Sequence, residues 1–218
     1  MTEPDVALTD YGLALECAVF AWLIYRHGKR SGALRSWVVL FFASAAVAPI
    51  CGGTVHGFFL DETSTGYAVL WPLSLLAIGV IALSGWSIGA QLILSRVLAR
   101  WVVCVACFQL AVYAAVVLFV SDAFWVAVIQ YLPAALFLLI AFVLVARRRG
   151  QAGVALGAWG LALTVVAAAF QQLRVTIHPV YFNHNALYHA VQAIAFALVF
   201  VGCRSLLQST GGLDADTT

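Results

Sequence analysis

The sequence predicts an all-α integral membrane protein built as a bundle of seven transmembrane helices. Two observations predict this fold: 64% of the 218 residues are hydrophobic and only 9% are charged, and the apolar residues form seven long stretches. In soluble domains, about a quarter of all residues are charged. A chain with so little charge is therefore expected to be surrounded by lipid.

Each stretch is close to the roughly 20 residues that a helix needs to cross the hydrocarbon core. The third stretch is long. Ser84, Ser87 and Gly89 near its end allow its C-terminal boundary to be placed only to within several residues. The acidic start of the chain lacks the basic region of a signal peptide, so no cleaved signal is expected. We expect one transmembrane domain over residues 1–207 and a short, polar, disordered tail over 208–218. The predicted segments are 8–25, 34–59, 66–94, 101–120, 123–145, 154–173 and 183–207.

The loop charges predict the orientation of the bundle, because cytoplasmic loops retain Lys and Arg. Basic residues follow the first, third and fifth segments, whereas acidic residues lie at the start of the chain and after the second and fourth segments. This pattern places the N-terminus outside and the C-terminus in the cytoplasm. The Arg-rich composition is typical of a GC-rich bacterial genome, so we expect the bacterial inner membrane. The basic set is Arg26, Lys29, Arg30, Arg35, Arg96, Arg100 and Arg147 to Arg149; the acidic set is Glu3, Asp5, Asp10, Asp61, Glu62 and Asp122.

The last segment is unusual because it carries imidazoles and amides. A helix places Asn185, His189 and Gln192 on one face, since residues three and four apart overlie each other. His184 points about 100° away from Asn185 on a regular helix. His56, near the end of the second segment, falls in the same outer half of the membrane. An intramembrane polar cluster of this kind is a functional-site hypothesis.

Two interpretations of these histidines stay open. His56 and His189, with His184 or Asn185, would suit Zn²⁺ if the second and seventh helices meet, because neutral imidazole is the commonest metal ligand. Alternatively, each imidazole bonds a neighbouring carbonyl or Gln and only stabilises helix contacts.

Glu16 is predicted to be the acid that lies deepest within a segment. Placing an ionised carboxylate within the membrane costs about 3 kcal/mol or more of free energy, unless the carboxylate is paired or protonated. Its partner would be a bound cation, Arg174 or a histidine. Glu16 is accordingly a candidate acid–base residue, or else an acid that fixes helix packing.

Two motifs resemble those of a known superfamily. Asn185-Ala186-Leu187-Tyr188-His189 resembles the His-Ala-Leu-Trp-His motif in the last helix of alkaline ceramidases, and Gly52-Gly53-Thr54-Val55-His56 resembles their Ser-x-x-x-His motif in the second helix. The same superfamily of seven-helix, metal-dependent membrane hydrolases includes the adiponectin-type receptors. The resemblance implies a zinc ion held by the positions of His56, Asn185 and His189, and a lipid substrate.

The sequence also departs from this pattern. The middle zinc ligand is Asn185 where the family has His, and Gly52 stands at the position of the family serine. The family aspartate at the start of the third helix has no clear counterpart, and Asp61 in the preceding loop lies nearest to its position. Either neighbouring groups substitute, with His184 as third ligand and Glu16 as acid–base residue, or the scaffold is kept without the chemistry.

Two functions follow as the main hypotheses. In the first, the protein is a zinc-dependent hydrolase of lipid amides or esters, in which the metal lowers the pKa of a bound water towards about 7 and Glu16 moves the proton. In the second, it is a non-catalytic membrane protein that binds, senses or assembles.

Other classes of function are less well supported. Two histidines at similar depth permit haem, but paired histidines in both leaflets are missing. A retinal protein is excluded, because the only lysine, Lys29, lies in a loop. The small net charge of +2 makes nucleic acid an unexpected partner.

Overall fold

The computed structural model describes residues 1–27, 32–178 and 181–209, and within them it contains seven helices and confirms the all-α fold. All seven are long and apolar enough to cross a membrane. Lys29, Arg30, Pro179 and the predicted tail from residue 210 onward lie outside the described residues. The helices are α1 (Pro4–His27), α2 (Ala33–Phe58), α3 (Thr65–Ile93), α4 (Arg96–Phe119), α5 (Phe124–Arg149), α6 (Ala152–Gln172) and α7 (His184–Ser209).

The main difference from the predicted segments is the start of α1. This helix begins at Pro4, not at residue 8. Proline fits the first turn, where its missing N–H leaves no bond unmade, and the carboxylate of Asp5 is favourable beside the positive end of the helix dipole. Asp10, which the loop-charge pattern counted with the outer acidic residues, therefore lies in the second turn of the helix and not at its very start.

Two other helices extend beyond their predicted segments, α4 at its start and α5 at its end. α4 begins at Arg96 because the Ser95 side chain caps it, accepting a bond from the Leu98 amide, 3.4 Å away. α5 continues through Arg149 to Gly150, which adopts a left-handed φ of 62°. Glycine adopts this conformation without strain, and it commonly ends helices.

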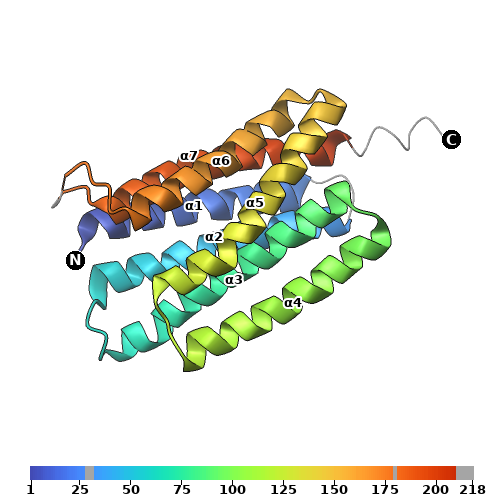
Figure 1. Cartoon of the computed structure of the whole chain (residues 1–218). Coiled ribbons are helices and arrows are strands. Elements are labelled where there is room, and N and C mark those ends of the chain that lie inside the picture. The colour runs from blue at the N-terminus through green and yellow to red at the C-terminus, as the bar shows by residue number, and fades with distance from the viewer. Residues whose placement is uncertain (28–31, 179–180, 210–218) are drawn as a thin grey trace.

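Successive helices run in opposite directions, so alternate loops gather at opposite ends of the bundle (Figure 1). The N-terminus and the loops after α2, α4 and α6 lie at one end, which we call the N-terminal end. The loops after α3 and α5 lie at the other end. We call it the arginine-rich end, because α4 begins there at Arg96 and α5 ends there at Arg149. The predicted orientation would place the N-terminal end outside the cell.

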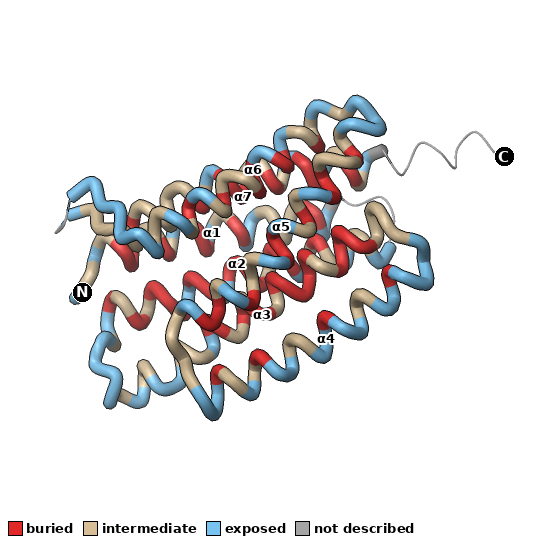
Figure 2. The backbone as a smooth tube through the Cα atoms, in the orientation of Figure 1, coloured by how far each residue is buried: buried red, intermediate tan, exposed pale blue. Residues whose placement is uncertain are grey.

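Six of the helices form a closed ring. Contacts run from α1 to α2, α3, α5, α6, α7 and back to α1, whereas α4 packs mainly against α3. Figure 2 shows long buried stretches along α2 and α3, and mostly exposed positions along α4. An exposed apolar helix on the outside of a bundle suits a lipid environment.

The arginine-rich half of the ring is filled by side chains. Phe20, Phe42 and Phe200 pack together, with Phe20 and Phe200 stacked 4.3 Å apart. α6 and α7 approach so closely that a Cβ on Gly160 would lie 2.5 Å from the Ala195 carbonyl oxygen. Small residues allow such close contacts between membrane helices. The cavity described below lies in the other half of the ring, at the N-terminal end.

Candidate functional site

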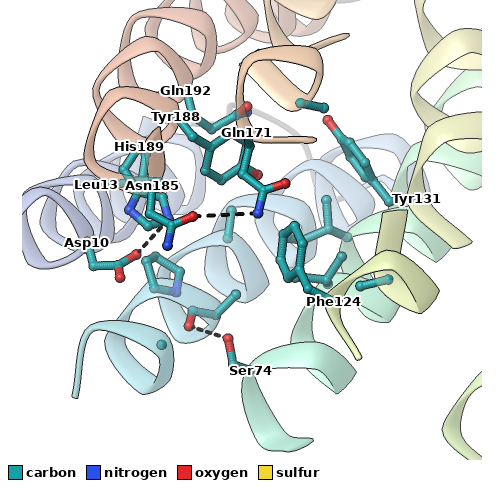
Figure 3. Close-up of a pocket in the computed structure, with 18 of the residues that line it drawn as sticks. Asp10, Leu13, Ser74, Phe124, Tyr131, Gln171, Asn185, Tyr188, His189 and Gln192 are labelled. Carbon is teal, nitrogen blue, oxygen red and sulfur yellow. Dashed lines mark hydrogen bonds and ion pairs between the residues drawn. The ribbon is translucent and has the colours of Figure 1, made fainter. Parts of the chain in front are cut away.

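A cavity of about 280 Å³ lies between the six ring helices, in the N-terminal half of the bundle (Figure 3). Its volume is close to the lower end of the range for small-molecule sites, roughly 300–1,000 Å³. Among the described residues, α4 contributes nothing to its wall. The polar part of the wall consists of Asp10, His56, Ser74, Gln171, His184, Asn185, His189 and Gln192, and the aromatic part of Trp71, Phe124, Tyr131, Tyr188 and Phe196.

Asp10 of α1 is the acid of this wall, and only 2% of its surface is exposed. Its Oδ1 lies 3.2 Å from Nε2 of His189 on α7. Its Oδ2 is buried and has no hydrogen-bond partner among the described residues. Gly53 of α2 allows α1 to approach α2 closely at this point. A Cβ on Gly53 would come within 2.7 Å of the Asp10 Cβ.

His56 lies where the first residues of the chain cross the end of α2. Its Nδ1 is 2.6 Å from Oε2 of Glu3. The backbone amides of Thr2 and Glu3 donate to the carbonyls of Gly57 and His56. This short segment thus holds one nitrogen of the His56 ring while the side chain lines the cavity.

The start of α7 is fixed by Asn183. Its side-chain oxygen accepts bonds from the amides of Asn185 and Ala186, at 2.9 and 3.1 Å, so it acts as a helix cap. Its own amide donates to Asp5 of α1 over 3.1 Å. The cap places Asn185 toward α6, where the Gln171 amide donates to it over a long 3.5 Å.

A second polar level lies one turn deeper. Gln192 donates to the hydroxyl of Thr164 over 3.1 Å. Gln192 Oε1 and His189 Nδ1 are buried and have no partner within the described structure. Beyond this level the wall becomes apolar, with Leu13, Ala45, Ile78, Ile81 and Phe196.

The structure brings most of the candidate residues to one place. His56, His184, Asn185 and His189 all line the cavity. Glu16 is not part of the wall, although one of its carboxylate oxygens is buried without a partner among the described residues. The carboxylate in the wall belongs to Asp10, which the loop-charge pattern counted only among the outer acidic residues at the start of the chain. The pair Pro4-Asp5 is typical of a helix start, and it could have predicted that Asp10 lies one turn or more inside the first helix.

The candidate ligands do not form a ready zinc site. Structural and catalytic zinc sites use at least three closely placed protein ligands. The parts of the chain that the structure describes contain no group of three or more His, Cys, Asp or Glu side chains arranged to hold a metal ion. His56 and His189 each have one nitrogen engaged by a carboxylate. Zinc binding stays a prediction.

Comparison with known proteins identifies a family whose function is unknown. No curated protein matches the chain. Residues 6–208, which include all the cavity residues, match a protein family described as a family of unknown function, DUF6962. The chain therefore belongs to the DUF6962 family.

Proposed function

We propose that this protein binds a lipid or another amphipathic membrane molecule in the cavity of its N-terminal half. The change of polarity along the wall carries this proposal. Ala45 and His56 both line the cavity and are separated by about 16 Å along α2, at 1.5 Å rise per residue. An amphipathic molecule could therefore place its polar end among His56, Asp10 and Asn185, and its chain against Ile81 and Phe196.

Unpartnered polar atoms support a bound molecule. Buried polar groups normally have hydrogen-bond partners. Asp10, His189 and Gln192 each contribute a buried atom without one among the described residues. Water or the polar end of a ligand would satisfy these atoms.

The test is to fill the cavity and analyse the lipids that copurify. Ala168 of α6 lines the cavity and is partly exposed, so Ala168→Phe narrows the cavity without a buried clash. Ala111→Phe, at an exposed position of α4, is the matched control. Quantitative lipid mass spectrometry should show a species bound to the wild type and to Ala111→Phe and depleted in Ala168→Phe. Equal lipid content in all three would refute the proposal.

A second candidate function is hydrolysis of a lipid ester or amide without a metal. The Asp10–His189 contact favours it. With its proton on Nε2, His189 donates to Asp10, and Nδ1 can accept a proton from water as the water oxygen attacks a carbonyl carbon. The bond to the leaving oxygen or nitrogen then breaks, and the proton passes to that atom. This function ranks second because Nδ1 is buried, so the imidazole must turn before water reaches it.

Hydrolysis is tested by release of fatty acid from N-acyl and O-acyl lipids, measured by mass spectrometry. His189→Gln and Asp10→Asn should both abolish release, whereas Gln172→Asn, at an exposed position outside the cavity, should leave it unchanged. Release that survives His189→Gln would exclude this mechanism.

A further inference from the structure

The described cavity wall carries an acidic side chain but no Lys or Arg. Among the described residues that line it, Asp10 is the only Asp, Glu, Lys or Arg. Within the described part of the chain, no arginine or lysine of this wall faces the carboxylate, and the one charged-group contact of Asp10 is with His189, which is cationic only when protonated.

A carboxylate at this depth needs a cation or a proton. Burial disfavours an ionised carboxylate strongly unless a positive charge and hydrogen-bond donors meet it. His189 reaches Oδ1 alone, and Oδ2 remains buried and unpartnered among the described residues. A ligand with a positively charged N–H group would supply both missing features.

Aromatic rings surround the same space. Trp71, Phe124 and Tyr188 come from α3, α5 and α7, and all three line the cavity. The ring centres of Trp71 and Phe124 are 6.4 Å apart, and those of Phe124 and Tyr188 are 6.5 Å apart. Figure 3 shows Asp10 on one side of this space and Phe124 on the other. Aromatic faces attract ammonium groups through their quadrupoles.

We infer that the ligand of the cavity is an amphipathic amine. This inference rests on the proposed binding function and names its ligand class. The ammonium group lies between the Asp10 carboxylate and the aromatic rings, and the hydrocarbon chain lies against Leu13, Ile81 and Phe196. Neutral amphipathic molecules of the same shape leave Asp10 without a counter-charge, so they bind more weakly.

Octylamine and 1-octanol form a matched pair of probes, because they differ only in the polar group. At neutral pH a primary alkylamine is protonated, as lysine is. Binding is measured calorimetrically to the full-length protein in phosphatidylcholine nanodiscs, with empty nanodiscs as the blank for partition into lipid. We expect the wild type to bind octylamine about tenfold or more tightly than octanol.

Variants separate the cavity carboxylate from general surface charge. Asp10→Asn should abolish the preference for octylamine over octanol, and saturable octanol binding that persists in this variant reports that it is folded. Glu62→Gln, in the exposed loop after α2, removes the same charge outside the cavity and should change neither affinity.

The outcomes distinguish this inference from the proposed function. Equal, saturable binding of both probes that Ala168→Phe blocks would leave the binding site standing and overturn the amine inference. Preference for octylamine that survives Asp10→Asn would also overturn it. Absence of saturable binding for both probes, together with equal lipid content in Ala168→Phe and the wild type, would overturn the inference and the proposed function.

Discussion

Asp10 of α1 and His189 of α7 meet inside the bundle, with 3.2 Å between Asp10 Oδ1 and His189 Nε2. The first and last helices are thereby joined at the level of the cavity, where the ring of six helices closes. Both side chains are largely shielded from solvent. Removing one partner leaves the other buried without its bond, which costs more than the bond itself contributes.

A double-mutant cycle should reveal this coupling. We expect Asp10→Asn and His189→Gln each to lower the free energy of unfolding by about 1–3 kcal/mol. The double variant should lose less than the sum, with an interaction energy of about 0.5–3 kcal/mol. Equilibrium unfolding in mixed micelles measures all four proteins. Strict additivity would show that the two side chains do not interact.

The position of Asp10 depends on Gly53. A Cβ at residue 53 would lie 2.7 Å from the Asp10 Cβ and 3.3 Å from the Ala7 carbonyl oxygen. Gly53→Ala should therefore push α1 away and destabilise the protein by about 1–3 kcal/mol, as overpacking does. Gly12→Ala is the control, because a Cβ there would meet no atom within 4 Å. We expect Gly12→Ala to be neutral or more stable by up to about 1 kcal/mol. Thermal unfolding that ranks the two variants equally would contradict this packing.

The helices could be predicted from sequence because their apolar stretches are long, but the face that each helix turns inward could not. Glu16 follows Asp10 by six positions, which turns it about 120° away on a regular helix. α1 is apolar around much of its circumference, so its pattern does not say which of the two acids faces the ring. Packing against Gly53 and His189 decides in favour of Asp10. The cluster on α7 was predictable because Asn185, His189 and Gln192 repeat with helical spacing.

A hydroxyl and a carboxylate lie beside the position where the resemblance implies a serine. The resemblance aligns Gly52 with that serine, and a Cβ on Gly52 would lie 3.4 Å from Ser74 Oγ of α3 and 3.8 Å from Asp10 Oδ2. Ser74 donates to the Ala48 carbonyl over 2.8 Å. A hydroxyl and a carboxylate thus adjoin this position, but they come from α3 and α1. Motif matching within one helix does not detect these neighbours, because their placement is a property of the packed bundle.

The orientation of the bundle can be tested by labelling single cysteines with a membrane-impermeant reagent. The background should replace Cys104 and Cys107, which are exposed, whereas the other three cysteines are buried. In intact cells, Glu62→Cys should react and Arg148→Cys should react only after the cells are opened, because the acidic loops are predicted to lie outside. The reverse pattern would place the cavity at the cytoplasmic side.

Zinc binding is best tested at Asn185. Asn185 and His189 lie one turn apart on α7 and line the same cavity as His56. An amide oxygen is a weaker zinc ligand than imidazole, so Asn185→His should tighten zinc binding by about tenfold or more, by creating the three-histidine set that the resemblance implies. Titration against a chelator and elemental mass spectrometry measure affinity and stoichiometry.

Three further variants decide which side chains such a zinc ion would use. Gln172→His adds an imidazole at the same end of the bundle, on an exposed position outside the cavity, and should bind no more zinc than the wild type. In the Asn185→His background, His56→Ala should reverse the gain because it removes one of the three imidazoles. His184→Ala should leave the gain intact, because His184 points about 100° from residue 185 on the helix. A gain that survives His56→Ala but not His184→Ala would show that His184 is the third ligand, and no gain at all would show that the three positions cannot share a metal ion.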